Sequence, residues 1–536
     1  MTQVPPAPST APVRDVHASL PRIDRHKPKC GPVRKSNVGR WRAAVLIGVH
    51  VLIGLHFLHW AFTGKSVSPV EPSEAMQTIE MGRINAGFLL FVSLIASTLI
   101  FGRWFCGWGC HVVALQDLCA WILGRLGLKP RPVRSRLLVL APWLVAGQMF
   151  LWPILHHWID PVEKYLPPVA DWQLEVMSTD LWATFPKWIM APVSILVVGF
   201  LIVWWLGAKG FCTHGCPYGA FFTVADRISP MRIKVTPSCD GCGHCTSVCT
   251  SNVRVHEEVA KHGRIVDPGC MKCLDCVSVC PKEALYFGLG KPAFFATSQQ
   301  RLQARADFTW PEEIGLAVVA LVATQWTFRG AWFGEGVPFL LSVALGVITA
   351  VFAMLGWRLV RRTELTFQHT LMKQAGRFTR AGKWGALAVA VWLAFTVHTF
   401  VGQRLKDSAM EQFRALAAPP AAPGAVVPDL PTVLAATERA LAWDLVDDPV
   451  VGEMRALLLR RLNRHVDAEA QFLAVLEARG GFSYAESDLI LASYFMDPRR
   501  QRYDDAERLL DALLARQPDH PQARQMKAFL EERKKK

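Results

Sequence analysis

Several common sequence signals are missing from this 536-residue chain. Residues 1–40 are rich in proline and basic side chains but lack the apolar stretch and cleavage site of a secretory signal peptide, so we expect a disordered cytoplasmic tail. The sequence contains no C-x2-C-H motif for covalent haem and no threonine motif for covalent flavin. Charged residues make up only 19% of the chain, whereas 51% are hydrophobic and the mean hydropathy is +0.22. This composition is too apolar for an ordinary soluble protein and indicates a membrane protein.

The net charge of +15 and the fourteen cysteines each have two explanations. A basic excess is typical of nucleic-acid binding, but also of the cytoplasmic loops of membrane proteins. Because the Lys and Arg residues collect beside the apolar segments, we assign the charge to membrane orientation and expect no nucleic-acid partner. Most of the cysteines stand at metal-ligand spacings, which favours metal binding in a reducing compartment over a disulfide framework.

Seven apolar segments approach the roughly 20 residues that a helix needs to cross a bilayer. They are residues 41–62, 84–101, 136–158, 188–206, 312–328, 338–357 and 384–402. We predict a mainly α fold: a polytopic transmembrane bundle of about seven spans, with an inserted two-[4Fe-4S] ferredoxin domain and a C-terminal helical domain that resembles tetratricopeptide repeats (TPR-like). The expected division is tail 1–40, membrane domain 41–230, ferredoxin domain 231–290, second membrane part 291–402, linker 403–430 and TPR-like domain 431–536.

Charge in the loops predicts the orientation of these spans. Segments 102–135 and 358–383 are basic and are expected in the cytoplasm, whereas 159–187 is acidic and is expected outside. No predicted outside segment contains cysteine, and neither does the chain after residue 402. We therefore expect a multi-pass protein of a bacterial cytoplasmic (inner) membrane, with a cytoplasmic ferredoxin domain and a periplasmic C-terminal domain. The N-terminus is expected inside because basic residues precede the first span: Arg22, Arg25, Lys27, Lys29, Arg34, Lys35, Arg40 and Arg42.

The C-terminal part follows an Ala/Pro-rich stretch between residues 415 and 431, which is typical of a semi-extended linker. Its small and apolar residues recur with the spacing of the second helix of a tetratricopeptide repeat, in two copies. A generic pair of helical hairpins is the alternative, because the first-helix Trp and Gly signals are missing. The residues that carry the pattern are Ala468, Phe472, Val475, Ala506, Leu510, Leu513 and Pro518.

Eight cysteines between the fourth and fifth segments repeat the spacing C-x2-C-x2-C-x3-C, and proline follows the second copy. In this spacing three thiolates bind one [4Fe-4S] cluster and the fourth binds the other cluster. We predict a crossed partition: Cys239, Cys242, Cys245 and Cys280 for the first cluster, and Cys249, Cys270, Cys273 and Cys276 for the second. Zinc knuckles are the alternative, but zinc modules use four ligands in C-x2-C pairs. Thr250 replaces the proline that often follows the fourth cysteine of the first copy.

Two C-x3-C pairs stand at the predicted cytoplasmic ends of the second and fourth spans: Cys106 with Cys110, and Cys212 with Cys216. Residues i and i+4 share a helix face, so we expect each pair to offer two thiols to one redox centre at the cytoplasmic edge of the membrane. Four thiolates suit an additional iron–sulfur cluster or a single iron, although zinc has the same ligand preference. Two redox-active dithiols and buried small hydrophobic side chains are the other interpretations.

The order of these motifs resembles a known family. Arg103-Trp-Phe-Cys-Gly-Trp-Gly-Cys, then Phe211-Cys-Thr-His-Gly-Cys-Pro-Tyr-Gly-Ala, then a two-cluster ferredoxin, is similar to the NapH, NosR and CcoG group of membrane polyferredoxins over residues 40–290. The resemblance implies electron transfer between the quinone pool, the cytoplasmic face and periplasmic acceptors. His111 stands where this family usually has proline, and the C-terminal domain differs from the flavin and immunoglobulin-like domains of some members.

Several histidines lie near the predicted outer ends of the spans, where they could serve a quinol site or a b-type haem. The alternative is that they lie in the membrane interface beside tryptophan, bound by water and lipid headgroups. Cys30 and Cys119 have no partner in the sequence and are interpreted as ordinary thiols. The histidines are His56, His59, His156, His157 and His398.

Three functions follow from these features. The leading hypothesis is a quinol dehydrogenase-type electron-transfer subunit that exchanges electrons with quinone or quinol and passes them through the clusters to a partner redox protein. The alternatives are an assembly factor that reduces a metal such as copper for an oxidase, and a redox sensor. Under each of them the TPR-like domain is expected to recruit a protein partner, and membrane lipid surrounds the spans.

Overall fold

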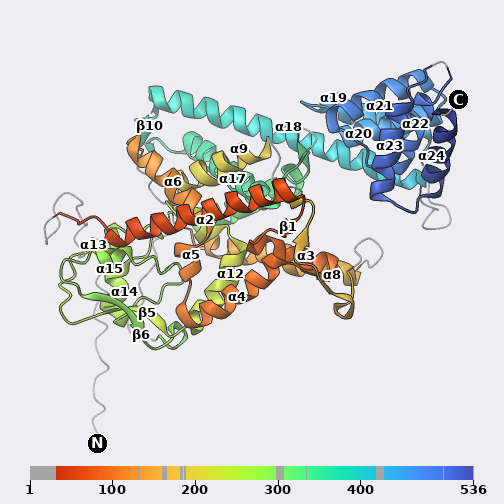
Figure 1. Cartoon of the computed structure of the whole chain (residues 1–536). Helices are drawn as coiled ribbons and strands as arrows, with labels where there is room; N and C mark the ends of the chain where they lie inside the picture. Colours follow the sequence, from red (N-terminus) through yellow and green to blue (C-terminus); the bar gives the residue numbers. More distant parts are fainter. Residues whose placement is uncertain are drawn as a thin grey trace, which may run out of the picture. The chain divides into compact units, whose positions relative to one another are not determined.

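The computed structural model describes residues 32–128, 133, 135–159, 166–181, 185, 189–296, 307–332, 335–417, 428–498 and 500–534. Cys30 and the predicted tail up to residue 31 lie outside the described residues. The chain divides into two units, Met1–Thr184 with Gly199–Asp307 and Phe185–Val198 with Phe308–Lys536. Figure 1 shows the whole chain coloured along the sequence.

All seven predicted apolar segments are helical. Four helices in the described part are long and apolar enough to cross a membrane: Asn37–Thr63, Leu137–Ile159, Phe339–Arg361 and Arg380–Leu416. Ala86–Phe101 and Met190–Leu206 are shorter apolar helices. The remaining segment forms α16 (Trp310–Val322) and the π-helical turn η8 (Ala323–Thr327). The number of seven membrane passages stays a prediction.

The first unit begins with helix α2, Asn37–Thr63, which includes the last four residues of the predicted tail. The helix begins there because the Ser36 side chain accepts a hydrogen bond from Gly39 N, and it ends at Gly64 in a left-handed conformation. Two short two-stranded sheets follow before the ferredoxin domain. The remaining elements before the ferredoxin domain are β1 (Ser66–Val67), η1 (Pro72–Glu74), α3 (Ala75–Met81), β2 (Arg83–Ile84), α4 (Ala86–Phe101), α5 (Trp104–Trp108), α6 (His111–Arg125), η2 (Leu137–Leu140), α7 (Ala141–Ala146), η3 (Gly147–Leu151), α8 (Trp152–Ile159), η4 (Val169–Asp171), β3 (Gln173–Leu174), β4 (Met177–Ser178), α10 (Ile202–Leu206), α11 (Gly210–His214) and α12 (Pro217–Ile228).

The ferredoxin domain is enclosed by one antiparallel strand pair, β5 (Met231–Val235) and β6 (Leu285–Leu289), in which Met231 pairs with Leu289 and Val235 with Leu285. Between the strands lie α13 (His244–Ser247), α14 (Val255–His262) and α15 (Asp275–Ser278), and η7 (Ala293–Phe295) follows β6. Its small core combines aliphatic side chains with cysteines. The strand pair therefore brings the two ends of the eight-cysteine segment together.

The second unit contains α9 (Met190–Ser194), the first part of η6 (Ile195–Leu201), α16, η8 and α17 (Phe339–Arg361). The carboxylate of Glu312, at the start of α16, bonds the Arg358 guanidinium on α17. Two short antiparallel sheets complete this part: β7 (Ala331–Trp332) with β8 (Glu335–Gly336), and β9 (Leu365–Phe367), β10 (Thr370–Gln374) and β11 (Arg377–Phe378) in the order β11-β10-β9.

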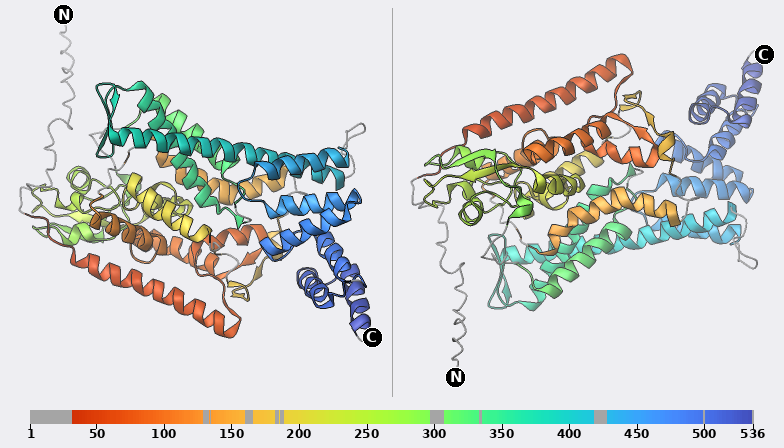
Figure 2. Two further views of the ribbon diagram at one scale, coloured as in Figure 1. Left: turned by 90° about the horizontal axis from the view of Figure 1, so that it is seen from above. Right: turned by 90° about the horizontal axis from the view of Figure 1, so that it is seen from below.

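Helix α18, Arg380–Ala417, is one continuous element of 38 residues, visible as a long ribbon in Figures 1 and 2. Residues 403–417 are therefore helical, where the sequence predicted linker. The reason is packing: Ala409 and Phe413 are buried in the core of the C-terminal domain. That domain consists of α19 (Leu430–Trp443), α20 (Pro449–Arg461), α21 (His465–Arg479), α22 (Ala485–Phe495), α23 (Tyr503–Arg516) and α24 (Pro521–Lys534).

The residues that suggested tetratricopeptide repeats are buried in this C-terminal core. Ala468 and Phe472 lie on α21, and Ala506, Leu510 and Leu513 lie on α23. Neighbouring helices in the chain pack on each other. Helical pairs with a shared core are thus present, while their assignment as tetratricopeptide repeats stays a prediction.

Candidate iron–sulfur sites

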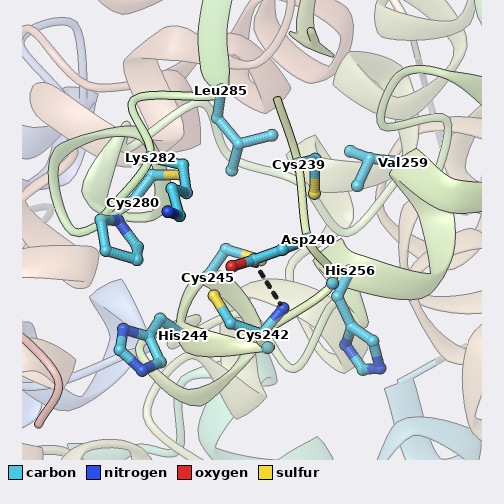
Figure 3. A pocket seen from close by; sticks show the side chains of 13 residues that line it. Cys239, Asp240, Cys242, His244, Cys245, His256, Val259, Cys280, Lys282 and Leu285 are labelled. Atoms are coloured by element: carbon cyan, nitrogen blue, oxygen red, sulfur yellow. Dashed lines mark hydrogen bonds between the residues drawn. The ribbon is translucent and has the colours of Figure 1, made fainter. Parts of the chain in front are cut away.

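Four cysteines of the ferredoxin domain line one cavity. We call Cys239, Cys242, Cys245 and Cys280 the first ferredoxin set. Figure 3 shows these side chains around the cavity, with His244, His256 and Lys282 at its border. Cys280 comes from the far end of the second motif and reaches the first three cysteines because β5 and β6 pair. This grouping fits the crossed partition, which stays a prediction.

The loop that carries the first three cysteines depends on left-handed backbone. Gly241 has φ 71° and Gly243 has φ 81°, so the chain wraps back between the ligands. The second motif uses the same conformation at the equivalent positions, Lys272 with φ 50° and Leu274 with φ 63°. Non-glycine residues in this region cost about 1–2 kcal/mol each, so the surrounding contacts must hold them there. The two motifs therefore form the same local structure.

The remaining ferredoxin cysteines, Cys249, Cys270, Cys273 and Cys276, form the second ferredoxin set. Burial, followed by the nearby Cys273 and Cys270, raises the pKa of Cys249 to about 12. Cys249 thus lies beside the second motif, although it belongs to the first in sequence. Burial, followed by Cys242, likewise raises the pKa of Cys245 to about 12. Grouped thiols of this kind need a strongly positive partner to ionise.

The chemistry of these sets fits a [4Fe-4S] cluster, because every member is a cysteine thiol. In the described residues no group of three or more His, Cys, Asp or Glu side chains is placed to hold one metal ion. The four cysteines of the first ferredoxin set all line the same cavity. Cysteine thiolates are the ligands of such clusters, and each bound cluster would exchange single electrons.

The two C-x3-C pairs lie on two similar segments. The first arm consists of α4, α5 and α6, and the second arm of α10, α11 and α12. In each arm the short helix ends at a glycine with nearly the same backbone angles: φ −122° and ψ −12° at Gly109, φ −126° and ψ −18° at Gly215. A Cβ at these glycines would meet the ring of Phe105 at 2.7 Å or of Phe211 at 2.9 Å. Glycine is therefore required at both turns.

The glycine turns overturn one prediction about the pairs. Cys106 lies within α5 and Cys110 is the N-cap of α6, and Cys212 and Cys216 have the equivalent places in α11 and α12. The expectation that each pair shares one helix face was wrong, because the helix ends between the two cysteines. Their approach follows from this sharp turn instead.

We call Cys106, Cys110, Cys212 and Cys216 the arm set. Cys212 lies in electrostatic range of the other three, and Cys216 in range of Cys106. The Cys212 thiol also donates to Gln116 Oε1 at 3.2 Å. Cys106 and Cys212 are buried. The four thiols thus lie within electrostatic range of one another, and their service as one redox centre stays a prediction.

The first arm meets the second ferredoxin set directly. Gly107 packs so closely on the ferredoxin loop that a Cβ would overlap the carbonyl oxygen of Met271, and it would lie 3.3 Å from Cys273 N. The indole of Trp108 donates to the carbonyl oxygen of Lys272 at 3.1 Å. From the second arm, the carbonyl of Leu206 accepts a bond from Asn252 at 3.0 Å. Both arms therefore contact segments that carry the second ferredoxin set.

A buried carboxylate holds this junction. Asp226, at the end of α12, is 0% exposed and bonds Arg232 at 2.8 Å, Lys272 at 3.0 Å and the backbone N of Arg103 at 3.1 Å. Burial alone would raise its pKa, but Lys272 and Arg232 hold the pKa of the Asp226 carboxyl below its usual value. Breaking a buried pair of this kind costs about 3–5 kcal/mol, so the network ties the arms to the ferredoxin domain. No motif in the sequence predicted this network.

The outer histidines have local partners. His56 bonds the carbonyl of Val67 at 2.9 Å and His59 bonds Ser66 Oγ at 3.0 Å, so both contact β1. His156 stacks on Trp152, and His398 stacks on Trp443, each with nearly parallel rings. Cys119 is buried on α6 against Leu123 and Val203. A shared histidine site stays a prediction.

Comparisons with known proteins agree with this geometry. Residues 238–285 match the family of 4Fe-4S dicluster domains, and residues 86–129 and 189–236 both match a family described as 4Fe-4S binding domain. The second family covers the two arms separately, as their matching turns would predict. No solved structure matches the chain. The fold and the matches define a ferredoxin-type protein with apolar helices.

Three relatives illustrate what this chain is similar to. The chain is 29% identical over 184 residues to the methylamine utilization ferredoxin-type protein MauN of Methylobacillus flagellatus, covering 33% of this chain and 60% of the relative. It is 29% identical over 168 residues to the ferredoxin-type protein NapH of Haemophilus influenzae, covering 30% and 50%. The putative electron transport protein YccM of Escherichia coli is 24% identical over 252 residues, covering 41% and 68%. The chain is thus similar to ferredoxin-type proteins of the NapH and MauN kind, and it spans about half to two thirds of the length of these relatives.

Proposed function

We propose that this protein relays electrons between the quinone pool and a partner redox protein, at a bacterial cytoplasmic membrane. The observation that carries the proposal is the contact of Gly107 and Trp108 with the loop of Met271 to Cys273. This contact brings the arm set beside the second ferredoxin set, and that set lies beside the first within one small core. The three cysteine sets therefore form a continuous series.

The series ends at a surface. Cys239 is exposed, whereas Cys106 and Cys212 are buried among apolar helices. We propose that the first ferredoxin set faces the soluble partner and that the arm set faces the membrane donor. The arm set would hold an additional iron or iron–sulfur centre, and the two ferredoxin sets would hold one [4Fe-4S] cluster each.

Replacing Gly107 by alanine tests the series. The new Cβ would overlap the Met271 carbonyl, so the ferredoxin loop has to move away from the arm. We expect severalfold slower reduction of the ferredoxin clusters by menaquinol or ubiquinol, with unchanged iron content. Stopped-flow absorbance of the purified protein in lipid nanodiscs measures the rate of cluster reduction. Iron analysis of the same protein measures the iron content.

Gly124→Ala is the matched control for this variant. Gly124 lies in α6 of the same arm, and a Cβ there would have nothing within 4 Å. Its reduction rate should equal that of the unmodified protein. Equal rates in the Gly107 variant would contradict the proposed route past Met271.

We also propose that the C-terminal domain lies in the periplasm and recruits a partner protein. The support is the predicted count of seven passages from a cytoplasmic N-terminus. An alkaline phosphatase fused after Lys536 should be active in cells, because that enzyme folds only outside the cytoplasm. A fluorescent reporter that matures only in the cytoplasm should stay dark there. The reverse pattern would mean an even number of passages.

A further inference from the structure

A fully buried lysine stands beside the arm set without a partner. Lys209 is 0% exposed, and within the described part of the chain its ammonium has neither a hydrogen bond nor an ion pair. It lies in electrostatic range of Cys212. A buried charge is strongly unfavourable unless an opposite charge accompanies it. The lysine therefore points to an anion at this place.

The first arm has a buried cation at the same place. Arg103 is 4% exposed, its Nη2 lies 3.9 Å from the Cys106 sulfur, and it is in electrostatic range of Cys216. Its Nη1 bonds the carbonyl of Pro268 at 2.9 Å. Gly219 makes room for it, since a Cβ there would lie 3.2 Å from Nη2. The guanidinium thus contacts Cys106 of the first arm and lies in electrostatic range of Cys216 of the second.

The two cations correspond to each other in sequence and structure. Each stands three residues before the first cysteine of its arm, and each is the N-cap of the short helix that carries this cysteine. Two arms that share the same turn thus each place a cation beside the arm set. This repetition distinguishes the pair from an isolated buried charge, and it could have been read from the sequence.

The nearby carboxylate does not neutralise Lys209. Asp226 is already shared by Arg232 and Lys272. Neutral thiols or two disulfides in the arm set would leave Lys209 without an opposite charge. Thiolates would supply that charge, and a thiolate-bound iron centre carries a net negative charge that grows by one on reduction.

We propose that Arg103 and Lys209 are fixed positive charges beside the arm set that raise the reduction potential of the centre bound there. The inference rests on the proposed function, in which the arm set takes one electron from a quinol-type donor. The added electron increases the negative charge beside two buried cations, so the reduced form is stabilised relative to the oxidised form. Both are positioning residues, and neither transfers the electron.

Redox titration followed by electron paramagnetic resonance tests the proposal on the full-length protein in nanodiscs. In Lys209→Gln the midpoint potential of the arm-set signal should fall by about 59 mV or more, which is a tenfold change for a one-electron couple. Lys209→Arg keeps the charge and should restore most of the potential. The signals of the two ferredoxin clusters should shift less.

Lys282→Gln is the control. Lys282 borders the first ferredoxin cavity but is exposed and screened by water, so its replacement should leave the potential of the arm-set signal unchanged. Arg103→Gln provides a second test in case the lysine variant does not fold, and its potential should also fall. An arm-set signal with unchanged potential in both glutamine variants would overturn the counter-charge inference alone. A protein that never shows this third signal would overturn the proposed arm-set centre as well.

Discussion

Replacing Cys249 by alanine should destroy the cluster of the second ferredoxin set and leave the first intact. Cys249 belongs to the first motif in sequence, yet its thiol lies beside Cys270 and Cys273. Cys280 in turn lines the first cavity. The iron of the ferredoxin domain should therefore fall from about eight to about four atoms per chain. Iron analysis and the resonance spectrum of the remaining cluster measure this loss.

Cys280→Ala is the reciprocal variant and should remove the other cluster. Cys119→Ala is the control, because this buried thiol belongs to none of the three sets. Loss of the first cluster in the Cys249 variant, with the second retained, would refute the crossed partition. Zinc in place of iron in the unmodified protein would refute the cluster assignment itself.

Replacing Cys106 and Cys212 together by alanine should block reduction by quinol while leaving both ferredoxin clusters in place. Each arm loses the cysteine of its short helix, so the arm set keeps only the two N-cap thiols. We expect loss of any iron beyond about eight atoms and of the third resonance signal. Dithionite, which needs no membrane donor, should still reduce the ferredoxin clusters.

The outcome of this double variant also separates the interpretations of the arm set. Loss of quinol-linked reduction without loss of iron would favour two redox-active dithiols. Unchanged iron and unchanged transfer would mean that the four cysteines only pack, and the shared centre would be rejected. Cys119→Ala again serves as the control for removal of a buried thiol.

The sequence predicted the helices well because their apolar runs are local. Seven long stretches with few charges can hardly be anything but helices, and the described residues of all seven are largely helical in the structure. Where the sequence erred, distant contacts decided. Residues 403–417 are polar enough to suggest linker, but Ala409 and Phe413 are buried by the C-terminal helices and extend α18.

The ligand chemistry was also contained in the sequence. The two C-x2-C-x2-C-x3-C motifs and the two C-x3-C pairs are short patterns whose spacing alone indicates metal binding. The position of Arg103 and Lys209 three residues before a cysteine was equally readable. However, a basic residue at the end of an apolar helix usually marks membrane orientation, so the sequence alone does not distinguish the two roles.

Only the tertiary structure decided how these pieces meet. The turn at Gly109 separates Cys106 from Cys110, the pairing of β5 with β6 brings Cys280 to the first cavity, and the bare backbone of Gly107 lets the arm approach Met271. The periodic pattern of apolar residues does not predict these features. Each joins residues that are far apart in the chain or depends on the space around one atom. Sequence alone thus determined the helices and the cysteines of a ferredoxin-type protein, whereas folding determined which thiols share a cavity and which buried cations lie beside them.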